Sequence, residues 1–225
     1  VRYVLLEKEC KNKKIRFILT AHHKEDQIET FLIRLSRGSG VQGLSAMHTL
    51  ASLNNNIKIF RPFLSNSKKE LVFTSKKVFG SFIKDPSNKN KKFLRTGMRK
   101  LLPILKKYGI KEDQIIRSIN NLKSSSQTIN VYFKDIIKKI VKKKSNYFVI
   151  NKRDLLSLNQ ELQLRVLSFV IKTINKADYP PRSKKIFNVL KILSLTKNCN
   201  HQLGGCLIKS NKNHVNIKKL GNRGF

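Results

Sequence analysis

The segment from Ala21 to Met47 constrains the fold of this chain most strongly, because it joins two histidines, several carboxylates and a glycine-rich turn to a helical pattern of apolar residues. Residues 24–36 have apolar side chains at three- and four-residue spacing, which predicts an amphipathic helix. On its polar side, His22, Asp26 and Glu29 fall at positions i, i+4 and i+7. We therefore expect one stripe of imidazole and carboxylate groups opposite a packed apolar face.

The residues around this helix predict an α/β fold with part of a doubly wound parallel sheet. Residues 15–20, IRFILT, are apolar and β-branched, which is typical of a buried parallel strand. This strand would deliver His22 and His23 to its carboxyl end, the edge of an α/β sheet where ligands usually bind. A second strand is predicted at 57–60, and Ser67 to Glu70 reads as a capping box that opens another helix. A brief strand near 82–83 and a turn at 85–88 should follow.

The rest of the chain is predicted to be mainly helical, with a domain boundary near residue 110. We expect an α/β domain over 1–110 and a basic, mainly helical domain over 111–225. From residue 92 the pattern is helical, with Arg95 and Arg99 on one face. Beyond Tyr108 and Gly109 the predicted elements are one or two basic helices at 113–144, a strand at 147–150, helices at 160–174 and 183–193, and a hairpin of 205–209 with 214–218.

The charge of the chain predicts a polyanionic partner. Lys and Arg number 48 against 13 Asp and Glu, a formal net charge of +35. Nucleic acid is favoured over a membrane surface, because the chain has no Trp and no apolar run near the roughly 20 residues of a membrane span. A genome rich in A and T would also raise the lysine content. The absence of a secretory signal in residues 1–14 indicates the cytoplasm.

Two further patterns are interpreted as structural. Cys199, His201, Cys206 and His214 could be drawn as a zinc site, but their spacing fits no finger or ribbon, and Gly204-Gly205 is typical of a hairpin turn. Residues 38–43 match the letters G-x-G-x-x-G, yet they follow a helix instead of opening one, so we expect a helix C-terminal turn. Arg37 beside exposed amides at Gly38 could still hold an anion.

The stripe of His22, Asp26 and Glu29 has three interpretations from the residues alone. It is a solvated helix face, a metal site in which His and Asp share an ion, or a site for a nucleotide and an amine. In the third case the carboxylates would bind Mg²⁺ or a substrate ammonium group and the imidazole would meet a phosphate.

The wider motif resembles the tRNA(Ile)-lysidine synthases, which are PP-loop ATP pyrophosphatases. The resemblance covers residues 15–105 and consists of Ala21-His22-His23 with Glu25-Asp26-Gln27 and Glu29-Thr30, then Arg34-Leu35-Ser36-Arg37-Gly38-Ser39-Gly40, Gly43-Leu44 with Met47, Arg61-Pro62-Phe63-Leu64, Lys69-Glu70-Leu71, and Asp85-Pro86-Ser87-Asn88 with Arg95, Arg99 and Pro103. Glu25 stands where the family usually has Asp, and Thr96 where it commonly has Asn. The family's SGGxDS loop, which cradles the ATP phosphates, does not occur in these 225 residues. We therefore expect a fragment whose first strands and nucleotide loop lie upstream of Val1.

The resemblance implies a ligase that uses ATP and Mg²⁺ to join free L-lysine to the wobble cytidine of an isoleucine tRNA, releasing AMP and diphosphate. It implies catalytic roles for His22, Asp26 and Glu29. Asp26 and Glu29 would bind the substrate ammonium or, for Asp26, Mg²⁺, with Arg95 at the edge of the substrate site. His22, Arg37 and Gly38 would contact ATP or its phosphates. The tRNA backbone would be bound by Arg99, Lys138, Lys139, Lys142 and Lys143.

Two other functions stay open at this point. A tRNA-binding fragment without activity would have the same charge and would differ only in lacking the nucleotide loop. A metal-dependent phosphohydrolase would use His22, His23 and Asp26, although no further cluster of His and Asp supplies the remaining ligands.

Overall fold

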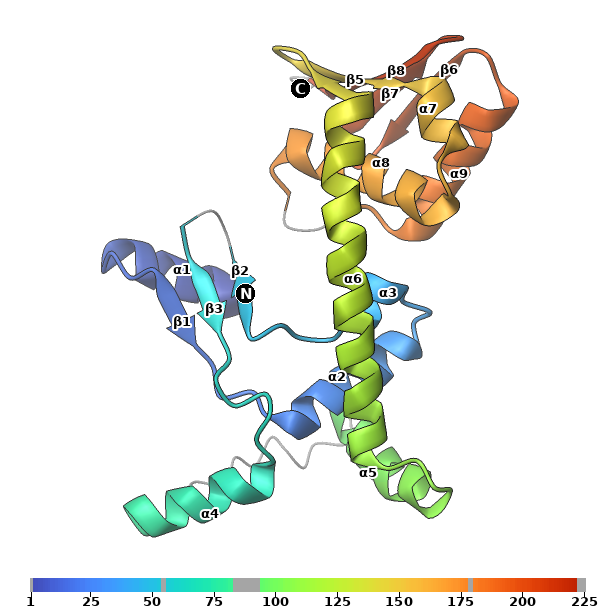
Figure 1. Cartoon of the computed structure of the whole chain (residues 1–225). Helices are drawn as coiled ribbons and strands as arrows, with labels where there is room; N and C mark the ends of the chain where they lie inside the picture. The colour runs from blue at the N-terminus through green and yellow to red at the C-terminus, as the bar shows by residue number, and fades with distance from the viewer. Residues whose placement is uncertain (1, 54–55, 83–93, 178–179, 222–225) are drawn as a thin grey trace. The chain divides into compact units, whose positions relative to one another are not determined.

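The computed structural model describes residues 2–53, 56–82, 94–177 and 180–221. The chain forms two compact units, residues 1–128 and 129–225, and helix α6 (Glu112–Ile140) contributes to both (Figure 1). The sequence placed a boundary near residue 110. The division by contacts comes later, because Ile115 and Ile119 at the start of α6 are buried with Ile28 and Ala46 of the first unit.

The first unit contains a small mixed sheet with strand order β1-β3-β2. Strands β1 (Phe17–Leu19) and β3 (Lys58–Phe60) are parallel, whereas β2 (Leu50–Ser52) runs antiparallel to β3. Ile18 and Ile59 are register partners and are buried with Cys10 of helix α1 (Arg2–Asn12). This confirms the predicted α/β class and its parallel pair. The sequence analysis did not predict β2.

Helix α2 (Lys24–Leu35) follows β1 and is the helix that the motif predicted. Ile28 is completely buried, and the partly buried Phe31 and Leu32 pack beside it. The predicted apolar face ends there, since Leu35 is about half exposed. Helix α5 (Leu94–Lys107) packs against α2 and brings Arg95 and Arg99 to the same helix.

A tight turn between α2 and the short helix α3 (Val41–Leu44) confirms the structural interpretation of the glycine pattern. Gly38 has φ +65°, the left-handed conformation that glycine adopts without strain after a helix. At Gly43, an added Cβ would lie 2.6 Å from the Cβ of Ser39, so a larger residue would collide with the turn. The glycines therefore serve backbone geometry in this segment.

Helix α4 (Lys68–Phe79) begins with the predicted capping box. The backbone N–H of Glu70 donates to the Ser67 hydroxyl, and the Glu70 carboxylate accepts from the backbone N–H of Ser67 at 2.7 Å. Glu25 of α2 also accepts from the backbone N–H of Lys68, at 2.9 and 3.0 Å. The N-terminus of α4 is thereby fixed to the N-terminus of α2.

The second unit is built on a five-stranded antiparallel sheet with order β4-β5-β8-β7-β6. Its strands are β4 (Val141–Lys143), β5 (Tyr147–Asn151), β6 (Cys199–Leu203), β7 (Cys206–Ser210) and β8 (His214–Lys219), and its further helices are α7 (Lys152–Ser157), α8 (Gln160–Asn175) and α9 (Ser183–Leu195). The predicted strand, helices and hairpin of this region are confirmed. Gly204 and Gly205 have φ +56° and +74°, as a two-residue hairpin turn requires.

The long basic helix was predicted to continue to residue 144, and this is wrong for its last residues. The helix ends at Ile140, and Lys142 and Lys143 lie in β4, which pairs with β5. The pairing explains the difference, because Val141 can align with the completely buried Ile150 only in an extended conformation. Local helix or strand propensity does not indicate which distant strand a segment will pair with.

Some predictions fall where the structure makes no statement. The turn at 85–88 and residue 83 of the brief strand at 82–83 lie outside the described residues, and residue 82 is not in a strand. Within the described residues, no helix combines the length and the apolar character needed to cross a membrane.

We predict that Ile119→Ala destabilises the first unit by about 2–5 kcal/mol, because it leaves a cavity between α6 and α2. Ile119 is 1% exposed, and its cluster holds Ile28 and Ala46. Urea denaturation followed by circular dichroism would measure the change. Ile104→Ala is the matched control, because Ile104 is 53% exposed on α5 and should change stability by less than about 0.5 kcal/mol. Equal losses from the two variants would contradict the assigned packing.

Candidate active site

The candidate site lies where β1 ends and α2 begins. The backbone N–H of Thr20 donates to the carbonyl of Phe60, which extends the parallel pairing to the first residue after β1. The Thr20 hydroxyl lies 2.8 Å from Nδ1 of His22, and this contact orients the imidazole. His23 is the N-cap residue of α2, so the two histidines mark the transition from strand to helix.

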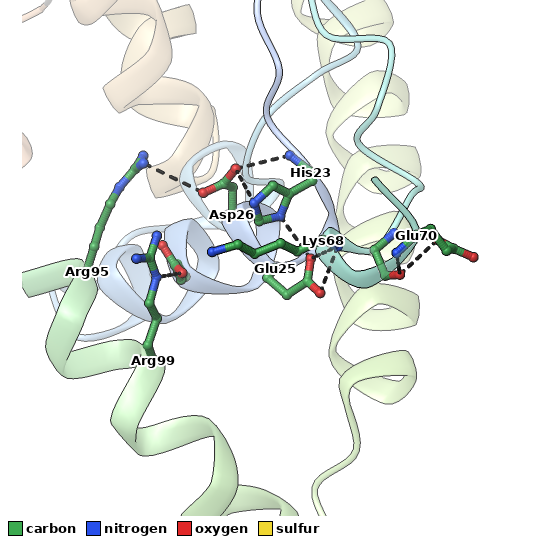
Figure 2. Close-up of polar contacts among 9 residues, drawn as sticks. His23, Glu25, Asp26, Lys68, Glu70, Arg95 and Arg99 are labelled. Atoms are coloured by element: carbon green, nitrogen blue, oxygen red, sulfur yellow. Dashed lines mark hydrogen bonds and ion pairs between the residues drawn. The ribbon is translucent and has the colours of Figure 1, made fainter. Parts of the chain in front are cut away.

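Asp26 is buried in the first turn of α2 and has three polar neighbours (Figure 2). Its Oδ2 accepts from the backbone N–H of His23 at 3.1 Å and lies 3.4 Å from His23 Nε2. Its Oδ1 lies 3.9 Å from Nη1 of Arg95 on α5. A carboxylate at this position also interacts favourably with the positive end of the helix dipole. One oxygen of Asp26 therefore supports the helix, and the other faces a cation.

Glu29 lies one turn further along α2 and is almost completely buried, with 1% of its surface exposed. Its Oε1 accepts from Nε of Arg99 at 2.6 Å, so the charge of the carboxylate is matched by α5. Its Oε2 is buried and has no hydrogen-bond partner among the described residues. Leaving a buried acceptor without a partner costs about 1–3 kcal/mol, so this atom is a candidate for contact with a bound donor.

Two cavities border these carboxylates. The first, of about 610 Å³, is lined by His22, Asp26 and Arg95 and reaches β1 and Thr20. The second, of about 420 Å³, is lined by Glu29, Leu102 and Pro103. His23, Lys68 and Arg99 line both. Of the predicted stripe, His22 and Asp26 therefore share one cavity and Glu29 lines the other, and both carboxylates face α5.

The structure adds Glu25 and Lys68 to the group that the sequence indicated, and it places His23 beside both Glu25 and Asp26 (Figure 2). His23 Nδ1 lies 2.8 Å from Glu25 Oε2, which places the imidazole between Glu25 and Asp26. Lys68 enters because Glu25 accepts from its backbone N–H. The capping box at Ser67 predicted where α4 begins, but only the tertiary fold shows that this helix end meets α2.

Arg37 and Gly38 are not brought to this group. Both are exposed in the turn after α2, and neither lines the two described cavities. Arg99, which was predicted to bind the tRNA backbone, pairs with Glu29 in this structure. The four lysines predicted to bind tRNA, Lys138, Lys139, Lys142 and Lys143, are exposed in the second unit.

Two polar motif residues have structural roles that the sequence analysis did not assign. The amide of Gln27 donates to the carbonyl of Met47 and accepts from its N–H, both at 2.8 Å and buried. Arg34 donates through Nη1 to the carbonyls of Gly43 and Ala46, at 2.7 and 2.8 Å. These bonds fix residues 43–47 against α2 and satisfy backbone groups that would otherwise be buried without partners.

The segment next to this turn is surrounded by cations. Arg61 donates through Nη1 to the carbonyl of His48 at 2.9 Å. Burial lowers the pKa of His48, and the charges of Lys123, Arg34 and Arg61 lower it further. Burial also lowers the pKa of Lys123. A neutral imidazole is therefore favoured at residue 48.

The residues described here do not bring three or more His, Cys, Asp or Glu side chains together as a metal site. On the hairpin, Cys206 is buried opposite Leu203, and its sulfur accepts from the amide of Asn175 at 3.0 Å. The arrangement therefore offers no support for the zinc site or for a phosphohydrolase centre at His22, His23 and Asp26.

Comparison with known proteins identifies the first unit. Residues 1–105 match the model of the PP-loop domain. The whole chain is similar to proteins named tRNA(Ile)-lysidine synthase, with 34% identity over 99% of the chain and 52% of the relative from Wolbachia pipientis wMel. It is 30% identical over 93% of the chain to the protein of Anaplasma marginale (strain St. Maries), and 30% identical over 96% to that of Rickettsia bellii (strain OSU 85-389). Residues 1–105 therefore form a PP-loop domain, and the chain is similar to tRNA(Ile)-lysidine synthases over nearly its whole length.

The chain spans about half the length of the curated relatives it matches. Most of the candidate site lies in the PP-loop match, which contains α2, the start of α4, and Arg95 and Arg99 of α5. The similarity to the three lysidine synthases continues through the second unit, which lies beyond the PP-loop match.

We predict that Arg99→Ala destabilises the first unit by about 1–3 kcal/mol, because it leaves the buried Glu29 carboxylate without its cation. Arg95→Ala is the matched control on the same helix, since Arg95 is about half exposed and its contact with Asp26 is long, at 3.9 Å. It should cost less than about 1 kcal/mol. Chemical denaturation of both variants would measure the difference, and a smaller loss for Arg99→Ala than for Arg95→Ala would refute the assigned pairing.

Proposed function

We propose that this chain is part of an enzyme that joins L-lysine to the wobble cytidine of an isoleucine tRNA, with ATP converted to AMP and diphosphate. The observation that carries the proposal is the pair of buried carboxylates on α2, Asp26 and Glu29, each facing an arginine of α5 beside a cavity. The name of the relatives, tRNA(Ile)-lysidine synthase, supports a tRNA substrate. The PP-loop domain implies that ATP is used.

The reaction needs a group that receives the amine of lysine. A new carbon–nitrogen bond replaces a carbon–oxygen bond of cytidine, and the attacking amine must lose a proton. Asp26 and Glu29 would bind the ammonium groups of lysine. Glu29 Oε2 supports this assignment, because it is a buried acceptor without a partner among the described residues. A positioned carboxylate could also accept the proton of the attacking amine.

The reaction also needs cations that stabilise the diphosphate leaving group. His22 and Arg95 line the larger cavity, and Lys68 and Arg99 line both cavities. Their position beside the cavities supports a role in binding the diphosphate. We propose His22 as the contact to the adenylate or phosphate. Arg37 and Gly38 stay candidates for a phosphate contact outside these cavities.

Mg²⁺ is proposed as the metal that accompanies ATP. In proteins Mg²⁺ is commonly held by one or two carboxylates together with substrate phosphates, so a single protein oxygen is enough. Asp26 fits this requirement through Oδ1, whose described ion contact, to Nη1 of Arg95, is long at 3.9 Å. Its Oδ2 already accepts from the backbone N–H of His23. When bound, the ion would supply positive charge to the phosphates.

The tRNA backbone would be bound by exposed cations of the second unit. Lys138 and Lys139 lie in the last turn of α6, and Lys142 and Lys143 lie in β4. All four are exposed. Among the described ion pairs, these lysines have one carboxylate partner, Asp135, which lies 4.0 Å from Lys138. Such lysines would contact phosphates without reading sequence. Arg99 remains a candidate for a tRNA contact only where its pairing with Glu29 leaves part of the guanidinium exposed.

We predict that Asp26→Ala abolishes lysidine formation by the protein expressed from its complete reading frame, with tRNA affinity nearly unchanged. The physical reason is that the variant removes the carboxylate proposed for the ammonium and for Mg²⁺. Radiolabelled lysine incorporation into tRNA would measure activity, and filter binding would measure affinity. Asp26→Asn should also be inactive while it keeps an oxygen for the His23 N–H, which separates chemistry from helix capping.

The control for this experiment is Asp135→Asn, since Asp135 is exposed on α6 and lies outside both cavities. It should retain full activity. Parallel loss of activity and tRNA binding in the Asp26 variants would show that Asp26 is structural. An unmodified protein that binds tRNA and never incorporates lysine would instead support a non-catalytic tRNA-binding function.

We predict that Lys→Glu changes at Lys138, Lys139, Lys142 and Lys143 weaken tRNA binding in a salt-dependent way. Each lost phosphate contact should reduce the slope of log affinity against log salt by about 0.7–0.9. Binding titrations at several salt concentrations would measure this slope. Unchanged affinity and slope would assign these lysines to the general lysine enrichment of the chain.

A further inference from the structure

The five-stranded sheet of the second unit has one buried face and one open face. Side chains alternate along each strand, and one set is buried in the three central strands: Phe148, Ile150, Cys206, Ile208, Val215 and Ile217. This set forms one core with α8 and α9, which lie on one side of the sheet (Figure 1). The alternating residues point to the other side, which we call the open face.

Strand register places the residues of the open face in two adjoining rows. One row runs across the sheet from Lys142 through Val149, Asn216 and Lys209 to Asn200. The next runs from Tyr147 through Lys218 and Leu207 to Gln202. The three lysines and Tyr147 are exposed, whereas Val149 and Leu207 are only partly exposed.

The open face is basic and polar, and the five strands contain no Asp or Glu at all. Its cations are Lys142, Lys209 and Lys218, on three different strands. Lys142 and Lys209 are separated by three strand spacings, roughly 14 Å at about 4.8 Å each. They would therefore meet different phosphates of a polyanion and could not share one small anion.

The polar groups between the lysines favour a nucleic acid backbone over a membrane. Asn200, Gln202 and Asn216 offer amide donors of the kind that contact phosphate and sugar oxygens. Membrane-surface binding requires a continuous apolar area, and here the apolar residues of the open face are separated by amides and lysines.

We propose that this open face is an RNA-binding surface that contacts the phosphate–sugar backbone of the tRNA. The inference takes its partner, the tRNA, from the proposed function. The open face itself was not found by the sequence analysis. Lys209 and Lys218 come from the closing hairpin and join Lys142 only through the sheet. Tyr147, about two-fifths exposed beside Lys218, could stack on an unpaired base at the edge of the contact.

The test is a triple substitution of the open face, Lys142→Gln, Lys209→Gln and Lys218→Gln, in the 225-residue chain. Its matched control is Lys184→Gln, Lys185→Gln and Lys191→Gln, which removes the same charge from exposed positions of α9. Affinity for a transcribed isoleucine tRNA would be measured by fluorescence anisotropy across salt concentrations, without ATP or lysine. Circular dichroism would establish that both variants fold.

The open-face variant should bind tRNA at least about tenfold more weakly and reduce the salt slope by about 2, whereas the α9 variant should change affinity less than about twofold. An unrelated tRNA should show the same losses, because phosphate contacts carry no sequence information. Equal losses in the two variants, or no loss in the open-face variant, would overturn the proposal. Weaker binding to phosphatidylserine vesicles without weaker tRNA binding would also overturn it and assign the face to lipid.

The failure of this inference is distinguishable from failure of the proposed function. Lysine incorporation by the protein from the complete reading frame tests the function. Binding loss confined to the open-face variant, in a protein that never incorporates lysine, would leave the RNA surface standing and refute the ligase. Normal lysine incorporation and tRNA affinity in an open-face variant would refute the surface and leave the ligase standing.

Discussion

The ion pair between Glu29 and Arg99 is the contact on which the candidate site depends. Glu29 is 1% exposed, and a carboxylate buried to that degree is tolerated only with a charged or hydrogen-bonding partner. Arg99 supplies this partner from α5 and thereby fixes α5 against α2. Arg95, one turn earlier, is placed near Asp26 by the same helix. The part of each cavity wall that α5 contributes follows from this one arrangement.

The residues of the α2 motif divide into two groups by what they contact. Gln27 and Arg34 bond to backbone carbonyls and amides of residues 43–47, so they hold the turn in place. Asp26 and Glu29 contact cations beside cavities. The α2 motif therefore contains residues that hold the turn in place and residues that form the candidate site. Mutating any motif residue without a stability measurement would confuse these two roles.

The second unit adds a different kind of surface, in which the chemistry is spread over strands. Its buried face is continuous with the helices, and its open face is polar and free of carboxylates. In the proposed reaction the first unit would hold lysine and the phosphates, and the second would add affinity for the tRNA backbone. Three of the 48 Lys and Arg residues would act through positions that the sheet gathers on one face.

The sequence by itself determined the element types near the motif, because local rules act there: helical spacing in α2, a capping box at Ser67, and left-handed glycines at turns. It also placed Asp26, Glu29, Arg95 and Arg99 on the correct helices, and its resemblance indicated the PP-loop domain. Only the tertiary structure decided that α5 covers the carboxylates, that Lys68 joins them, and that Lys142 leaves the helix for a strand. These features depend on pairing between residues far apart in the chain, for which spacing along the sequence carries no signal.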